Sequence, residues 1–304
     1  MLKLHITNET SRLRAVILGL ANSNGPTPTL EEAYDPKSAE YIKAGTYPIE
    51  KDMVEEMTAV RDVLEKYEVK IYRPEQIEDY NQIFTRDIGF VIDDMFFKAN
   101  ILPDREREID AIQYVIDQID SKKVHRFPED HHIEGGDVMP IGDYIFVGTY
   151  RESDYSNYIT ARTNMKAVNA LQEMFPNKTV KSFNLRKSST DPRLNALHLD
   201  CCFQPVGKNK AIIHKNGFLN EVEYEWLVNF YGKENVFEID SDQMYAMNSN
   251  IFSIAEDVVI SEKNFTKLNA WLRAQGITVE EVPYAEISKQ EGLLRCSTLP
   301  LIRD

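Results

Sequence analysis

The side chains in this sequence that are best suited to chemistry stand just ahead of paired apolar segments. They are Asp87 in "FTRD", Glu134 in "IEGGD", His198 and Asp200 in "LHLD", Asn248 in "AMNSN" and Cys296 in "LLRC". A cysteine thiolate is a strong nucleophile, and an imidazole can donate and accept protons near neutral pH. Carboxylates can orient an imidazole or bind a cation. Together these residues form a constellation of a thiol, an imidazole and carboxylates that could do chemistry, provided that the fold brings them together.

A repeated unit indicates how the fold could do so. Five times a helical pattern runs into a short β-branched strand, near Ile71, His125, Lys181, Phe237 and Glu280. The strands are separated by 54, 56, 56 and 43 residues, which is the spacing that a repeated supersecondary unit leaves in a sequence.

Paired apolar segments, each split by a polar turn, lie between these units. Residues 88–99, 137–149, 201–214 and 251–261 have the alternation and turn residues of β-hairpins. A fifth hairpin lacks its second strand at the C-terminus, and the strand predicted at residues 12–20 could supply it. We therefore expect a single domain over residues 1–304, in which five hairpin-helix-strand units form a ring. The alternative is an open α+β sheet with coincidental spacing.

In a ring, equivalent positions point toward one centre, so the polar residues ahead of the hairpins should meet there. Each also has an ordinary structural interpretation. Asp87 could pair with its neighbour Arg86, Glu134 could accept backbone N–H groups from the glycine turn that follows it, His198 could be a hydrogen-bonded core residue, and Cys296 could be an inert buried thiol. Their joint occurrence at equivalent positions favours a site.

Composition limits the partners. The 35 Lys and Arg against 49 Asp and Glu give a net charge of −14, which would repel nucleic acid and anionic membrane surfaces and favours a small cationic substrate. The longest apolar run, residues 15–21, is too short to span a membrane. A homo-oligomer remains open.

The cysteines and histidines exclude further classes of site. Three cysteines, of which Cys201 and Cys202 are adjacent, form no disulfide framework and predict a cytoplasmic protein. We assign no function to these two, because neighbouring side chains on a strand point to opposite faces. No metal-ligand spacing is present, and we expect neither a metal nor an organic cofactor.

Five motifs carry a family resemblance. In order they are "NQIFTRD", "IEGGD", "HLD", "NSNIFSIAEDVVIS" and "LRCSTLPLIRD", and the resemblance runs from Arg12 to Asp304. They resemble the guanidine-group modifying enzymes, which include arginine deiminases, dimethylarginine hydrolases and amidinotransferases. The resemblance implies an α/β fold of the pentein type, a five-bladed pseudo-symmetric propeller, and a covalent cysteine thiouronium intermediate.

The resemblance also implies a role for each residue. It makes Cys296 the nucleophile, His198 the general acid and base, and Glu134 the carboxylate that orients the histidine. It implies substrate binding by Asp87 and Asp200, which would hold the guanidinium, by Asn81 near the substrate, and by Arg162 at a substrate carboxylate, with Arg151 as the alternative to Arg162.

The second nucleophile decides the reaction. With water, the enzyme would be a deiminase-like hydrolase of arginine or a related guanidine, which we favour; with an acceptor amine, it would be an amidinotransferase. A non-catalytic propeller that acts as a binding module, and a cysteine hydrolase of amides, are alternatives of other classes. Glu291 and Leu293 depart from the deiminase pattern, which has an arginine and a glycine there. An acidic residue at this position would repel an α-carboxylate and favour an amine.

Overall fold

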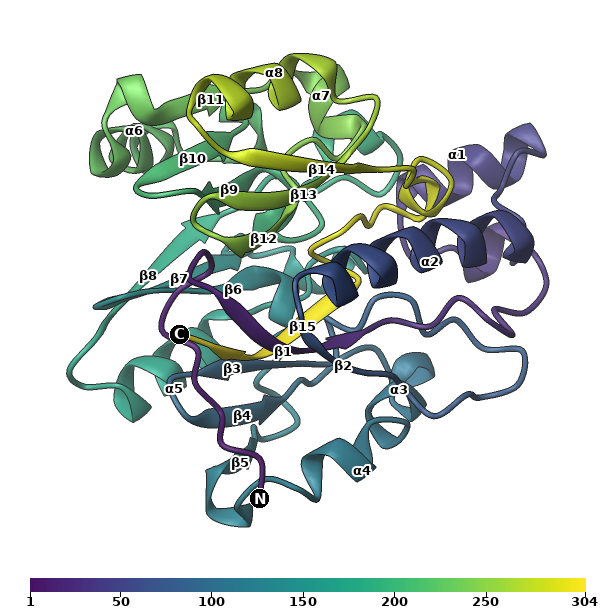
Figure 1. Cartoon of the computed structure of the whole chain (residues 1–304), viewed down its shortest axis with the longest axis horizontal. Coiled ribbons are helices and arrows are strands. Elements are labelled where there is room, and N and C mark those ends of the chain that lie inside the picture. Colours follow the sequence, from purple (N-terminus) through teal and green to yellow (C-terminus); the bar gives the residue numbers. More distant parts are fainter.

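The computed structural model describes all of residues 1–304 and shows five three-stranded sheets (Figure 1). In each sheet the central strand pairs antiparallel with one neighbour and parallel with the other. The sheets are, in strand order, β15 (Thr298–Arg303), β1 (Leu13–Leu18) and β2 (Lys70–Tyr72); β3 (Gly89–Ile92), β4 (Met95–Lys98) and β5 (Val124–Arg126); β6 (Val138–Ile141), β7 (Tyr144–Thr149) and β8 (Thr179–Asn184); β9 (Phe203–Val206), β10 (Lys210–Ile213) and β11 (Val236–Glu238); and β12 (Phe252–Ala255), β13 (Val258–Glu262) and β14 (Thr278–Val282). All five predicted third strands and all four predicted hairpins are present.

The two ends of the chain complete one sheet. β1 pairs antiparallel with β15, with Val16 opposite Pro300, and parallel with β2, with Val16 opposite Ile71. In Figure 1 the purple strand β1 and the yellow strand β15 lie side by side at the centre of the molecule. The N-terminal strand therefore supplies the missing partner of the fifth hairpin, as the sequence predicted.

Helices lie around the periphery of the sheets (Figure 1). They are α1 (Pro36–Ala44), α2 (Glu50–Lys66), α3 (Arg107–Asp110), α4 (Gln113–Ile116), α5 (Met165–Met174), α6 (Glu221–Tyr231), α7 (Ser241–Tyr245) and α8 (Thr266–Ala274). α2 buries Met53, Met57, Val60 and Leu64, which follow the i, i+4, i+7 spacing of a helix face. None of the helices has both the length and the apolar character needed to cross a membrane.

The helical segment of the second unit differs from the sequence prediction. Instead of one helix, two short helices, α3 and α4, precede β5. The break lies at Ile112, whose φ of −108° and ψ of 8° leave the helical region. This irregular segment positions Arg105, which lies just before α3 and becomes important in the site.

The strands β3 and β9, which begin two of the hairpins, are buried on both faces, whereas the outer strands β2, β5 and β11 are partly exposed. All four residues of β3 and of β9 are buried. Their short apolar runs are continuous rather than alternating, as expected for strands enclosed on both sides. The polar residues just ahead of these strands are therefore also carried into the interior, which makes their hydrogen-bond partners decisive.

Candidate active site

A cavity of about 630 Å³ opens where the hairpin units meet. Asp87, His198 and Cys296 line it, together with Asn81 and Arg162. Glu134 lies directly behind His198 and lines a neighbouring cavity. Residues from distant parts of the chain thus converge, as the ring arrangement predicted.

Cys296 is 3% exposed and is held by Asn250, which lies just ahead of β12. The side-chain amide of Asn250 donates to Sγ at 3.2 Å, and its oxygen accepts from the backbone N–H of Cys296 at 3.1 Å. Sγ lies 3.7 Å and 3.9 Å from the two carboxylate oxygens of Asp200. Burial, followed by the negative charges of Asp200 and Asp87, raises the pKa of this thiol well above its usual value.

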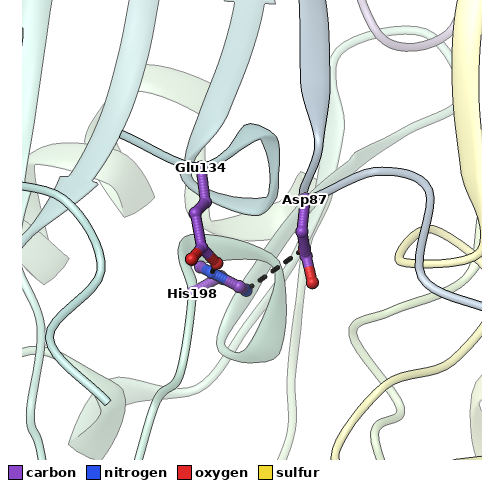
Figure 2. A group of neighbouring side chains, drawn as sticks. All are labelled: Asp87, Glu134 and His198. Carbon is purple, nitrogen blue, oxygen red and sulfur yellow. Dashed lines mark hydrogen bonds and ion pairs between the residues drawn. The ribbon is translucent and has the colours of Figure 1, made fainter. Parts of the chain in front are cut away.

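His198 lies between two carboxylates (Figure 2). Its Nε2 is 2.8 Å from Oε2 of Glu134, and its Nδ1 is 3.7 Å from Oδ1 of Asp87. Burial alone lowers the pKa of His198, but Asp87 and the hydrogen bond to Glu134 overcome this effect and raise it to about 9. At neutral pH the imidazole is therefore charged and carries an N–H at Nδ1, which has no hydrogen-bond partner in the protein.

Glu134 is in turn fixed by Arg162. Nη1 of Arg162 donates to both carboxylate oxygens, at 3.1 Å and 3.2 Å. Burial opposes ionisation of Glu134, but Arg162 and the hydrogen bond to His198 lower its pKa. The pair keeps an ionised acceptor on His198 and orients the ring.

Two glycines explain the local form of "IEGGD". A Cβ on Gly136 would lie 2.6 Å from both Cγ and Nδ1 of His198, and one on Gly135 would lie 2.1 Å from the carbonyl oxygen of Arg86. Both positions need a residue without a side chain because other parts of the site approach so closely. The turn that follows Glu134, a one-turn 3₁₀ helix at Gly135–Asp137, thereby lets the imidazole pack against the backbone.

Asp87 does not pair with Arg86, so the ordinary interpretation of this residue is wrong. Its Oδ2 accepts from Nη1 of Arg105 at 2.9 Å, whereas Oδ1 is buried without a hydrogen-bond partner and lies 3.7 Å from Nδ1 of His198. Arg105 also donates to both oxygens of Glu108, at 2.7 Å and 3.0 Å. Arg86 instead lies 3.9 Å from Glu9. Sequence reasoning missed Arg105 and Glu108, because their unit breaks the regular helix pattern.

Asp200 lies under the thiol rather than in the cavity wall. Its Oδ2 accepts from Nη1 of Arg295 at 2.8 Å, and Arg295 also donates to both oxygens of Glu9, each at 3.2 Å. Asp200 thus lies close to Cys296, but one of its carboxylate oxygens is hydrogen-bonded to Arg295, the buried residue directly before the cysteine.

The expectation for Asn248 was wrong. Asn248 lines a separate cavity beside α7, and Asn250, two residues later, reaches Cys296. Met247, the residue just before "NSN", has a left-handed backbone with φ of 68°. In "LHLD", His198 and Asp200 stand two positions apart and both lie near Cys296. This spacing was the sign in the sequence that the residue two positions after Asn248 could reach the centre.

The remaining predicted residues are placed as follows. Asn81 lines the cavity and donates from Nδ2 to Oε1 of Gln290 at 2.7 Å. Arg162 lines the same cavity, but Arg151 does not: it pairs with Glu223 elsewhere. Between the two candidate arginines, only Arg162 is therefore positioned to reach a ligand.

Asp87, Glu134 and His198 also bring potential metal-ligand atoms within 4.8 Å of one another. Nε2 of His198 is occupied by Glu134, however, and Glu134 is bound by Arg162. Two of the three groups are thus already engaged by other protein side chains.

Comparison with known proteins decides the family. The family described as "N,N dimethylarginine dimethylhydrolase, eukaryotic" matches residues 37–303. This chain belongs to that family. It is also 30% identical over 224 residues to the uncharacterized protein YkgA of Bacillus subtilis, covering 73% of this chain and 70% of YkgA.

Arginine deiminases are more distant relatives. The enzyme of Oenococcus oeni is 25% identical over 276 residues, and that of Listeria monocytogenes (strain EGD-e) is 26% identical over 263 residues, each covering 74% of this chain. The chain spans 61% and 62% of their lengths. By homology, this chain is thus a guanidine-modifying enzyme. The deiminases also contain sequence that the aligned region does not cover.

Solved structures show the same fold. The N-terminal domain of ArgZ, an arginine dihydrolase from cyanobacteria, superposes with a TM-score of 0.76 at 16% identity, covering 94% of this chain and 96% of that one. The inosamine-phosphate amidinotransferase StrB1 of Streptomyces griseus gives 0.76 at 15% identity, covering 100% and 97%. A dimethylarginine dimethylaminohydrolase adduct with S-methyl-L-thiocitrulline gives 0.69 at 17% identity, covering 95% and 100%. The predicted five-bladed pentein propeller is confirmed.

Proposed function

We propose that this protein hydrolyses a guanidine compound, arginine or a relative of it, through a covalent bond between the guanidinium carbon and Cys296. One observation carries the proposal. Nδ1 of His198 and Oδ1 of Asp87, which lie 3.7 Å apart, are buried without hydrogen-bond partners beside Cys296 in a single cavity. Buried polar groups normally have hydrogen-bond partners, so this donor and this acceptor indicate a ligand that forms hydrogen bonds with both.

A guanidinium fits these open groups. It is planar and permanently charged, so an N–H can donate to Oδ1 of Asp87 in a charge-assisted hydrogen bond. Its carbon then lies toward Sγ of Cys296, which shares the cavity wall with Asp87. Neighbouring carboxylates would stabilise the cation in this buried place.

The same cation would activate the thiol. Without a ligand, burial and the charges of Asp200 and Asp87 hold the pKa of Cys296 high. A guanidinium bound at Asp87 offsets this negative charge, which lowers the thiol pKa so that the thiol proton can pass to solvent through the cavity. The nucleophile is therefore formed where its electrophile is bound.

His198 serves both halves of the reaction. The charged ring donates its Nδ1 proton to the departing nitrogen as the tetrahedral adduct collapses to a thiouronium. The ring, now neutral, accepts a proton from water as the water attacks the thiouronium carbon. Collapse of the second adduct releases a ureido product and the thiolate, while Glu134 keeps the ring in place.

The relatives support this chemistry without choosing the second nucleophile. Arginine deiminases and a dimethylarginine dimethylhydrolase family use water, whereas StrB1 is an amidinotransferase. We favour water, because the cavity has one acid-base group that can activate it. A non-catalytic binding module would have no use for a thiol and an imidazole with open hydrogen-bond positions.

Turnover in ¹⁸O-labelled water tests the proposal. The substrates are arginine, agmatine, methylated arginines and guanidino acids, each with and without glycine or ornithine as acceptor, and the products are read by mass spectrometry. We expect label in a ureido product. Transfer of the amidino group to the added amine, without label, would identify an amidinotransferase instead.

Cys296→Ser is the matched control for this experiment. It should retain the fold and lose turnover together with labelling by a haloacetamidine, since a serine hydroxyl is a much weaker nucleophile here. Multiple turnovers by this variant would exclude the covalent mechanism.

A further inference from the structure

A second pair of carboxyl groups lies in the same cavity, apart from the catalytic group. Glu291 and Asp35 both line it. Glu291 is 4% exposed and has a left-handed backbone with φ of 57°. A non-glycine residue rarely adopts this conformation, and burial of a carboxyl group carries a further cost. Packing alone gives no reason for an acidic side chain at this position.

The contacts of Glu291 leave one oxygen open. Oε1 accepts from Nδ2 of Asn195 at 2.7 Å, Oε2 receives no hydrogen bond from an amide, amine or hydroxyl group, and the carboxyl group hydrogen-bonds to that of Asp35. Asp35 caps α1, where it accepts from the backbone N–H and the hydroxyl of Ser38, each at 2.7 Å. Each carboxylate oxygen can accept two hydrogen bonds, so the pair retains acceptor capacity toward the cavity.

Lysine supplies the positive charge near this pair of carboxyl groups. Lys37 lies near both carboxyl groups, but its Nζ donates to the carbonyl oxygen of Tyr245 at 2.6 Å, and the side chain does not line the cavity. Burial and the proximity of Asp35 raise the pKa of Glu291 well above its usual value. Glu291 thus holds a proton that it shares with Asp35, and a bound cation could take the place of that proton.

The cavity's own arginines do not supply that cation. Arg105 is bound by Asp87 and Glu108, and Arg162 is bound by Glu134. A ligand must bring it. An ammonium group is small and has three N–H donors, which suits an open Oε2 and a neighbouring carboxylate.

We propose that Glu291 and Asp35 form a binding subsite for a primary ammonium group on the tail of the substrate. The inference rests on the proposed function and narrows it: the substrates are guanidines that carry an α-amino or terminal amino group. Simple alkylguanidines and guanidino acids without an amine should be poor substrates.

Agmatine and 1-butylguanidine provide the test, because they differ only in the terminal amine. We expect agmatine to have a kcat/KM about 10- to 100-fold higher, the range for loss of a charge-assisted contact. In Glu291→Gln, which keeps the shape of the side chain, this ratio should fall most of the way to one. The control is Glu31→Gln, an exposed acidic residue at the same cavity, in which the ratio should be unchanged.

Several results would overturn the subsite. Equal kcat/KM for the two compounds in the native protein would do so, as would an undiminished ratio in Glu291→Gln or a preference for 4-guanidinobutyrate. Inertness of every guanidine would instead count against the proposed function. In that case, calorimetric titration of Cys296→Ser with the same two compounds tests the subsite alone, and equal affinities would reject it.

Discussion

His198 is buried between Glu134 and Asp87, and this arrangement fixes its charge. The carboxylates raise its pKa to about 9 even though burial opposes the charged form. Cys296 shows the opposite effect, because the same kind of neighbour raises the pKa of a thiol by disfavouring the anion. The site therefore holds a charged acid and a protonated thiol, which becomes a nucleophile only after it loses its proton.

The charge of His198 predicts the alkaline limit of activity. The first chemical step needs the imidazolium, so kcat/KM should fall as pH rises through about 9. Glu134→Gln removes a hydrogen-bonded negative charge, which lowers the pKa of His198 and should move this limb to lower pH by about one unit or more. The pH profiles of both proteins, with an NMR titration of the His198 ring, measure the shift. Identical alkaline limbs in the two proteins would show that Glu134 does not raise the pKa of His198.

The same pKa links His198 to stability. Since its folded-state pKa is raised above the ordinary value of about 6.5, its contribution to the free energy of unfolding is complete below that pH and is lost as pH rises through about 9.

Sequence reasoning found the residues with distinctive chemistry and missed their supports. Cys296, His198, Glu134 and Asp87 stand in recognisable motifs, and the structure brings them together. Arg105 and Asn250 carry no such signal, because an arginine or asparagine in isolation is compatible with any exposed position. Their functions depend on contacts between units, at Asp87 and Cys296 respectively. Such contacts are set by three-dimensional packing rather than by local spacing.

At the level of elements, the short turn between a strand and the next hairpin determines where each functional side chain points. Glu134 and His198 both precede one-turn 3₁₀ helices and have extended backbones, with φ of −119° and −133°. The hairpins were predictable from alternation and turn residues. Turn geometry was not, which is why Asn248 was chosen in place of Asn250 and why the break between α3 and α4 was not anticipated.

Gly136 should be necessary for the position of His198. In Gly136→Ala, a Cβ 2.6 Å from the imidazole would displace the ring, and a displacement approaching 1 Å can lower the rate by about 100-fold. We expect kcat to fall at least tenfold with a near-native thermal midpoint. Gly142→Asn is the control, since this turn position has φ of 61°, which asparagine tolerates, and open space around it. Full activity in Gly136→Ala would contradict the steric argument.

At the scale of the whole molecule, both chain ends close the ring, and this is the part of the fold that spacing predicted most directly. Five units with one missing strand required a partner from the N-terminus, and β1 is that partner. The buried side chains that tether the chain ends to neighbouring units were not predictable, because they join residues that are far apart in the sequence. Whether all five units unfold together as one domain remains a prediction.

Arg303 is the tether that allows this prediction to be tested. It is 1% exposed, and it donates from Nη1 to the carbonyl oxygen of Ser11 at 2.6 Å and from Nη2 to that of Ser253, in β12, at 2.8 Å. It thus joins the last strand to the N-terminal segment and to a neighbouring unit. Arg303→Met keeps most of the volume but leaves two buried carbonyl groups without these donors, so the free energy of unfolding should fall by about 2–4 kcal/mol.

Arg14→Met is the matched control, because Arg14 belongs to the same closure but is 46% exposed where it pairs with Asp304. An exposed pair contributes at most about 1 kcal/mol, so this variant should unfold close to the native protein in urea. If the ring is one cooperative domain, Arg303→Met will shift a single transition, seen alike by far-UV circular dichroism and tryptophan fluorescence. Two separate transitions would show that the units next to β15 open by themselves, and equal stability of the two variants would show that closure does not depend on the buried arginine.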